Sequence, residues 1–214
     1  MSDIYIAIVY HSGRGHTARQ AEAVGAGAAE IEGAAVALMT VGEAQNRWDD
    51  LNRADAIIFG APTYTGAASA AFKAFAEATS HAIMTQGFKW RDKVAAGFTN
   101  SGSRAGDNLA TLIELAILAA QHGMHWVNLG LPPANHSSTG SEDDLNRLGF
   151  WLGAAAQSNV DQGPDRAPPA ADLATARHLG RRVAGVTRAL VRGRVAAQEE
   201  ARARDRHTVG LASM

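Results

Sequence analysis

Short apolar runs alternate along the chain with longer alanine-rich segments, and this alternation constrains the fold more than any other feature. The apolar runs are nearly continuous and rich in β-branched residues, as in strands buried on both faces of a parallel sheet. Between them, apolar residues recur at helical spacing. The pattern predicts an α/β fold, a doubly wound five-stranded parallel sheet with helices on both faces. The predicted strands cover residues 4–10, 35–41, 54–59, 94–98 and 125–129, and the predicted helices cover residues 17–30, 43–53, 67–77 and 108–122.

The composition excludes several classes of protein. The chain has 214 residues, of which 46% are hydrophobic and 19% charged, so one domain of ordinary size can bury a core. Cysteine is absent, which excludes a disulfide scaffold, thiolate-held metal sites and a cysteine nucleophile. No apolar run approaches the roughly 18 residues that cross a bilayer, and the N-terminus lacks the pattern of a secretory signal. We therefore expect a soluble, single-domain, cytoplasmic protein with no membrane contact.

The last third of the chain carries a different pattern. Residues 131–169 are rich in proline, glycine and polar residues, which predicts a long loop with a short helix near residues 142–152. A final helix is predicted from about residue 171 to beyond residue 190, with a tail after about residue 205 that could be flexible. Residues 177–206 contain nine arginines and three acidic residues. Because the acids are interleaved and apolar residues recur at helical spacing, we interpret this segment as a packed helix with a solvated face and expect no nucleic-acid binding.

The segment after the first predicted strand has the character of an anion site. In open α/β sheets, ligands bind beyond the carboxyl ends of the strands. This segment contains Ser12, Gly13, Arg14, Gly15, His16 and Thr17, and a helix follows it. The free N–H groups and the dipole of a helix N-terminus attract an anion. The spacing matches neither a Walker loop nor a dinucleotide fingerprint, so it favours a terminal phosphate monoester. The alternative is an ordinary turn made of small residues.

The loops after the third and fourth predicted strands carry complementary groups. In residues 60–66, Pro62 fixes the backbone and Tyr64 offers a flat apolar face. Residues 99–107 are rich in small polar residues that expose backbone donors. Taken alone, the two segments could equally be a turn with an exposed tyrosine and a helix cap. Because the three loops meet at one edge of the sheet, together they predict a site for a phosphorylated flat heterocycle.

The motifs in these loops resemble those of the flavodoxin-like proteins that bind flavin mononucleotide (FMN). Among these, the sequence is most similar to the NAD(P)H:quinone oxidoreductases of the tryptophan-repressor-binding-protein type. The resemblance covers about residues 3–130 and resumes at residues 172–177. It rests on Ser12-x-x-Gly15-His16-Thr17, residues 57–64, residues 98–103 and His122-Gly123-Met124. It implies a flavodoxin-like sheet with the strand order 2-1-3-4-5.

The resemblance also implies a role for each loop. The first loop would hold the FMN phosphate, the second would line the isoalloxazine ring, the third would meet the ring edge and the ribityl chain, and one histidine would lie near the flavin. The matching residues are Ser12, Gly13, Arg14, Gly15, His16 and Thr17 in the first loop, Pro62, Thr63, Tyr64 and Thr65 in the second, Asn100, Ser101, Gly102, Ser103 and Gly106 in the third, and His122. We expect no catalytic side chain, because the cofactor supplies the redox chemistry. We expect no metal site, since no carboxylate pattern accompanies the histidines.

The resemblance implies an enzyme, an FMN-dependent oxidoreductase that transfers two electrons from NADH or NADPH to a small quinone-like acceptor. It further implies a homodimer or a homotetramer. One alternative is a flavodoxin-type electron carrier that docks on protein partners, and another is a partner-binding module without activity. Electron carriers of that type steer by strong negative charge. The net charge of −1 and the basic C-terminal segment count against a carrier.

Overall fold

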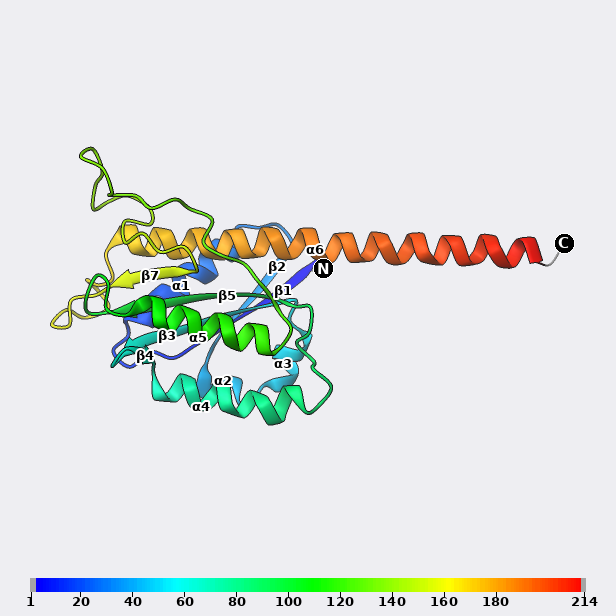
Figure 1. Cartoon of the computed structure of the whole chain (residues 1–214), viewed down its shortest axis with the longest axis horizontal. Helices are drawn as coiled ribbons and strands as arrows, with labels where there is room; N and C mark the ends of the chain where they lie inside the picture. The colour runs from blue at the N-terminus through cyan, green and yellow to red at the C-terminus, as the bar shows by residue number, and fades with distance from the viewer. Residues whose placement is uncertain (1–2, 213–214) are drawn as a thin grey trace.

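The structure, a computed structural model, describes residues 3–212, except for the side chains of residue 203 and of residues 205–212. Its centre is a parallel sheet with the strand order β2-β1-β3-β5-β6 (Figure 1). These strands are β1 (Ile4–Tyr10), β2 (Ala34–Thr40), β3 (Ala56–Tyr64), β5 (Val94–Ser101) and β6 (His125–Trp126). In chain order, the five strands follow 2-1-3-4-5, which confirms the predicted flavodoxin-like topology.

Two short strands were not predicted. One of them forms part of the sheet edge that was expected from the predicted fifth strand alone. Strand β4 (Ala67–Ala68) pairs antiparallel with the end of β3. Strand β7 (Ala154–Gln157) pairs parallel with residues 98–101 of β5, whereas β6 pairs only with residues 94 and 95. The predicted strand at residues 125–129 is therefore wrong in extent, because the chain leaves the sheet after β6 and returns as β7 to complete the same edge.

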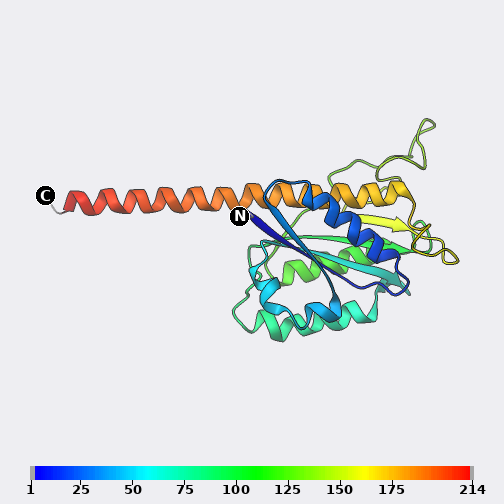
Figure 2. The ribbon, with the colours of Figure 1, turned by 180° about the vertical axis from the view of Figure 1, so that it is seen from behind.

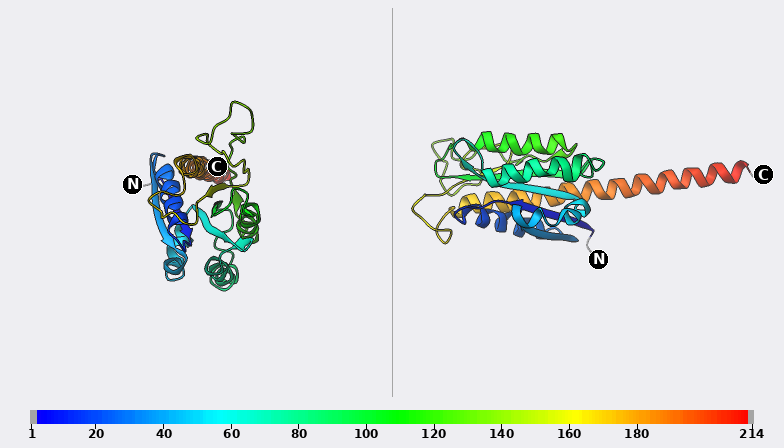
Figure 3. Two further views of the ribbon diagram at one scale, coloured as in Figure 1. Left: turned by 90° about the vertical axis from the view of Figure 1, so that its left-hand side faces the viewer. Right: turned by 90° about the horizontal axis from the view of Figure 1, so that it is seen from below.

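The helices lie on both faces of the sheet (Figure 3). Helices α1 (His16–Ala29) and α6 (Ala170–Ala212) cover one face, and the side chains of Ile4, Ile6 and Ile8 point into that layer. The other face packs against α3 (Trp48–Arg53), α4 (Ala70–Thr79) and α5 (Asn108–Gln121), beside the short α2 (Val41–Ala44) and the π-helical turn η1 (Ser80–Met84). The side chains of β1 point alternately into the two layers, and most of them are buried. This burial on both faces explains why the sequence of β1 is apolar almost throughout.

Three predicted helices differ from those observed. The segment at 43–53 forms two helices, α2 and α3, separated by a turn. The helix predicted at 67–77 begins only at Ala70, because residues 67 and 68 pair with β3. The short helix predicted at 142–152 does not form, and this region consists of turns. Its polar groups face the rest of the fold instead: the Asn146 amide donates to the carbonyl groups of Leu131 and Pro132, over 3.3 and 3.1 Å.

The final helix, α6, begins at Ala170, as predicted, and extends far beyond the body of the molecule (Figures 1 and 2). Its first half is buried at Leu179 and Val183, against α1 and the sheet. Residues 192–202 are exposed. A flexible tail was expected after about residue 205. The side chains of residues 205–212 lie outside the part of the chain that the structure describes, so this expectation stays a prediction. Within the described residues, no helix combines the length and the apolar character that a bilayer crossing requires.

Helices α1 and α6 cross at two glycines. A Cβ atom built on Gly27 would lie 1.8 Å from the carbonyl oxygen of Arg177, and one built on Gly180 would lie 1.9 Å from the carbonyl oxygen of Val24. Real atoms cannot approach so closely, so the two backbones can pack at this distance only because neither residue has a side chain. The position of α1, and hence of the loop that precedes it, depends on this crossing.

We expect Gly180→Ala to lower the free energy of unfolding by about 2 kcal/mol or more, because the added methyl group overlaps the backbone of α1. Gly185→Ala, in the same helix, is the matched control, since a Cβ atom there meets nothing within 4 Å. Alanine favours a helix over glycine by up to about 1 kcal/mol, so this variant should be neutral or more stable. Urea denaturation measures both values, and equal stabilities for the two variants would contradict the prediction.

Candidate functional site

The loop between β1 and α1 has the backbone geometry of an anion site. Gly15 adopts a φ of 87° at the N-cap of α1, a left-handed conformation that favours glycine. The Ser12 hydroxyl accepts a hydrogen bond from the Ala18 N–H over 3.1 Å. The amides of His16 and Thr17 lie in the first helical turn, where the helix itself offers no carbonyl acceptor. No acidic side chain occupies this turn, so the positive end of the helix dipole is uncompensated there.

A cavity of about 200 Å³ lies beside this loop, at the carboxyl edge of the sheet. It brings together residues from all three predicted loops and two residues from a fourth. The lining consists of Arg14, His16, Thr17, Pro62, Thr63, Tyr64, Asn100, Ser101, Gly102, Ser158 and Val160. Thr17, which carries a hydroxyl donor, lines this cavity and is nearly fully buried. A donor of this kind at a helix N-terminus suits an anionic oxygen.

The second predicted loop is mostly strand. Strand β3 continues through Pro62 to Tyr64, and the turn comes only at Thr65 and Gly66, whose φ values are 52° and 79°. The Tyr64 side chain is 43% exposed and extends over the first loop, where a Cβ atom on Gly13 would lie 2.5 Å from the Tyr64 hydroxyl. Tyr64 therefore forms a flat wall on the solvent side of the cavity, and its place against a flavin ring stays a prediction.

Thr63 lines the cavity, but its hydroxyl faces the protein interior. It lies 2.8 Å from the Thr99 hydroxyl, 2.7 Å from the Thr111 hydroxyl and 3.2 Å from the Asn108 side-chain oxygen. Buried hydroxyl groups must find partners within the protein, and this one finds them in β5 and α5. Thr63 thus fixes the end of β3, so that its side-chain oxygen is not free to bind a ligand ring.

The third loop follows β5 and is folded tightly on itself. The Ser101 hydroxyl donates to the carbonyl oxygen of Ser103 over 2.7 Å. Gly106 adopts a φ of 48°, and a Cβ atom there would lie 2.1 Å from the Ser101 hydroxyl oxygen. Asn100 lines the cavity, and its amide donates to the Ser158 hydroxyl over 2.9 Å. Six predicted residues of the three loops are not among those that line the cavity: Ser12, Gly13, Gly15, Thr65, Ser103 and Gly106.

A fourth loop completes the wall; it belongs to the long loop predicted at residues 131–169, but none of its residues was among the predicted site residues. Residues 158–164, here called the strap, follow β7 and cross the first loop. The carbonyl oxygen of Val160 accepts a hydrogen bond from Arg14 Nη1 over 3.1 Å, and His16 Nε2 lies 2.8 Å from the carbonyl oxygen of Gln162. The His16 side chain is therefore engaged by the strap. The available signal was the small apolar run at 154–157, which is too short to distinguish from loop.

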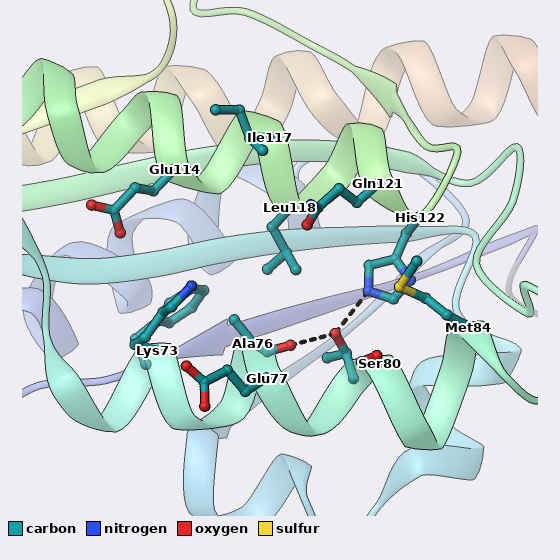
Figure 4. Close-up of a pocket in the computed structure, with 12 residues that line it drawn as sticks. Lys73, Ala76, Glu77, Ser80, Met84, Glu114, Ile117, Leu118, Gln121 and His122 are labelled. Carbon is teal, nitrogen blue, oxygen red and sulfur yellow. Dashed lines mark hydrogen bonds between the residues drawn. The ribbon is translucent and has the colours of Figure 1, made fainter.

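The structure does not bring His122 together with the other predicted site residues. The cavity lies at the start of α5, whereas His122 follows its last residue, and a helix of 14 residues is about 21 Å long. Figure 4 shows His122 in a different pocket, between α4 and α5, which Met84 also lines. This pocket has a volume of about 400 Å³.

His122 has a structural environment that explains its burial. The Thr79 hydroxyl donates to the carbonyl oxygen of Ala76, so His122 Nε2 donates to the Thr79 oxygen over 2.7 Å. The ring also packs on Trp90, with 4.7 Å between centroids. Its Nδ1 atom is buried without a partner within the described part of the chain. Burial lowers the pKa of His122 from 6.5 to about 4, so the ring is neutral at pH 7.

The sequence of this chain is similar to those of several known proteins. The sequence family described as "NADPH-dependent FMN reductase" matches residues 42–137. "Flavodoxin FldP" from Pseudomonas aeruginosa (strain UCBPP-PA14) is 44% identical over 183 residues, which cover 84% of this chain and 94% of that protein. "NAD(P)H dehydrogenase (quinone)" from Aromatoleum aromaticum is 32% identical over 213 residues, which cover 89% and 99% of the two chains.

A solved structure is similar over nearly its whole length. It is "the flavodoxin, WrbA-like protein from Agrobacterium tumefaciens", with 40% sequence identity and a TM-score of 0.66. The match covers 86% of this chain and 98% of that one. The two proteins therefore share the fold along most of this chain.

The burial of His122 generates a prediction about acid stability. The unfolded chain holds the His122 proton more tightly than the folded chain, so stability falls as the pH drops from about 6.5 towards 4, by at most about 3 kcal/mol. In His122→Phe this part of the pH dependence should be lost. His136→Phe, at an exposed position, is the matched control and should keep it. Urea unfolding at about pH 7.5 and about pH 5 gives the comparison, and an unchanged difference in His122→Phe would contradict the prediction.

Proposed function

Because the chain belongs to the flavodoxin-like, FMN-binding NAD(P)H:quinone oxidoreductases, we propose that it transfers two electrons from NADH or NADPH to a quinone-like acceptor. Family membership establishes an FMN-dependent oxidoreductase. The identity of the acceptor is the proposed part. The observation that carries it is the cavity at the N-terminus of α1, which offers anion donors at one end and an aromatic wall at its open side.

The residues present fit FMN. The backbone amides of His16 and Thr17 and the Thr17 hydroxyl suit a phosphate dianion, and the glycine at position 15 lets the backbone approach it closely. The cavity of about 200 Å³ has room for a ribityl phosphate chain, and Tyr64 would offer its flat face to the ring system. FMN bound here would supply the redox chemistry of the proposed reaction, namely hydride uptake from a nicotinamide and electron transfer to the acceptor.

The role of this chain is to hold and expose the flat ring. Tyr64 supplies one apolar face, and Thr63 fixes its position through the buried hydroxyl network. The residues opposite and beside it, Ala67, Ala68 and Gly102, have small side chains or none. A nicotinamide and a quinone are both flat, so each can occupy the same open face in turn. No side-chain acid or base is required for this exchange.

The second candidate is an electron carrier, and one observation favours it. The 44% identical relative from Pseudomonas aeruginosa is named a flavodoxin, and a carrier of that kind would use the same FMN site. The open ring face and the net charge of −1 favour small flat substrates over a charged protein partner. Oxidation of NAD(P)H in the presence of a quinone separates the two functions.

We also propose a homodimer or homotetramer in the cytoplasm, as the sequence predicted. An exposed apolar row on α5 supports self-association, because contiguous apolar surface of this kind marks protein contacts. The row contains Leu109, Ile113 and Ile117. Sedimentation equilibrium tests it: Ile113→Glu should shift the wild-type assembly towards monomers, and a monomeric wild type would contradict the proposal.

The phosphate site can be tested through one hydroxyl group. A hydrogen bond to a charged acceptor contributes about 1.5–3 kcal/mol, so Thr17→Ala should weaken FMN binding roughly 10- to 100-fold. Riboflavin lacks the phosphate, and its affinity should barely change. Thr85→Ala, at an exposed threonine in the turn after η1, is the matched control. Fluorescence titration measures both affinities, and an equal loss for FMN and riboflavin would contradict the assignment of this loop.

The shared ring face predicts ping-pong kinetics. Initial rates with NAD(P)H and a benzoquinone should give parallel lines in double-reciprocal plots, with competitive inhibition by excess quinone, because one substrate must leave before the other binds. Intersecting lines would show that both substrates bind together and would exclude a common face. An FMN-loaded protein that does not oxidise NAD(P)H would instead support the electron carrier.

A further inference from the structure

The strap is attached to the third loop at its start and to the first loop at its end. At its start, the Ser158 N–H donates to the carbonyl oxygen of Ser101 over 2.9 Å, and the Ser158 hydroxyl accepts from the Asn100 amide. At its end, Pro164 packs on the first loop so closely that a Cβ atom on Gly15 would lie 2.8 Å from its Cγ. Residues 158–164 therefore bridge the third loop and the first loop, and two of them, Ser158 and Val160, line the cavity.

The middle of the strap is held by two side chains of the first loop. Carbonyl groups only accept hydrogen bonds, so Arg14 donates to Val160 and His16 donates from Nε2 to Gln162. His16 is nearly fully buried, which makes its bond the less solvated of the two. Both side chains thus serve the strap, while the backbone amides of the same loop stay directed at the ligand position.

Val160 covers the remaining opening. Its Cγ1 atom lies 2.7 Å from the position of a Cβ atom on Gly102, so the strap lies directly on the third loop. Yet the Val160 side chain is 68% exposed, and an apolar group so exposed is not held there by burial in a core. Opening of the strap therefore costs the Arg14 and His16 hydrogen bonds and the packing of Pro164 on the first loop, with β7 and α6 unchanged.

We propose that residues 158–164 form a clasp over the phosphate end of FMN, which slows release of the cofactor and excludes a second phosphate. The inference rests on the proposed FMN site. It concerns a segment in which no residue was predicted to bind the cofactor. A phosphate held by Gly15, His16 and Thr17 lies beneath the strap, so the strap must lift before it can leave. A dinucleotide such as FAD would need its adenylate to pass through the same place, which the closed strap fills.

The first experiment loosens the strap in the full-length protein. Val160→Ala with Pro164→Gly removes the cover over Gly102 and the packing on Gly15. After FMN loading, dilution into excess apoflavodoxin gives the release rate from the change in flavin fluorescence. We expect this rate to rise about tenfold, the usual effect of losing one modest contact, with riboflavin affinity unchanged and FAD binding gained. Val195→Ala, at an exposed valine on α6, is the matched control.

A second pair of variants tests the same clasp through its buried hydrogen bond. His16→Leu cannot donate to Gln162 and should speed FMN release, whereas His16→Gln can donate and should restore most of the slow release. A loss of side-chain volume alone would affect both variants equally. This pair keeps the proposal testable if the double strap variant does not fold.

The outcomes separate the clasp from the proposed function. Unchanged release rates in a folded strap variant, or equal effects of His16→Leu and His16→Gln, would overturn the clasp and leave the FMN site standing. A wild-type protein that binds no FMN would overturn the proposed function, and the clasp with it. Faster release of FMN combined with unchanged riboflavin affinity supports both.

Discussion

The burial of the central strands on both faces is the constraint on which the rest of the structure depends. Ile6 and Ile8 of β1 point into one layer and Ala7 and Val9 into the other, and all four are fully buried. A strand enclosed in this way has no free surface along its length, so only its end can meet a ligand. The parallel arrangement places the ends of β1, β3 and β5 at one edge. The chemistry of the protein is thereby confined to the loops that leave that edge.

A buried ion pair fixes where the fourth of these loops begins. Arg147 lies in the long segment between β6 and β7, and it forms a two-fold contact with Asp172 of α6, over 2.8 Å for each pair of atoms. The same carboxylate accepts the N–H of Gln157, the last residue of β7, over 2.9 Å. Both side chains of the pair are almost fully buried, and loss of one partner in such a pair typically costs about 3–5 kcal/mol. The position of the strap is therefore set by residues remote from the ligand.

The sequence was sufficient to predict the strands and helices that have a long hydrophobic pattern. It was insufficient for segments and side chains whose position depends on tertiary contacts. The runs at 4–10 and 94–98 could be assigned because burial on both faces leaves an unmistakable composition. Ala154–Gln157 is a strand only because β5 offers an unpaired edge beside it, and four small residues carry no period of their own. The inward direction of the Thr63 hydroxyl depends on partners in two other elements. His122 was expected at the flavin because a motif matched, but the length of α5 carries it to the opposite end of the sheet.

The protruding half of α6 has a consequence for how the molecule moves through a solvent. About 20 residues of helix beyond the body form a rod about 30 Å long, comparable to the diameter of a small domain. A particle of this shape has a larger frictional coefficient than a sphere of the same 22.4 kDa. It therefore diffuses more slowly and elutes earlier from a gel-filtration column than its mass requires. An elution volume alone would make a monomer resemble a dimer, whereas sedimentation equilibrium is independent of shape.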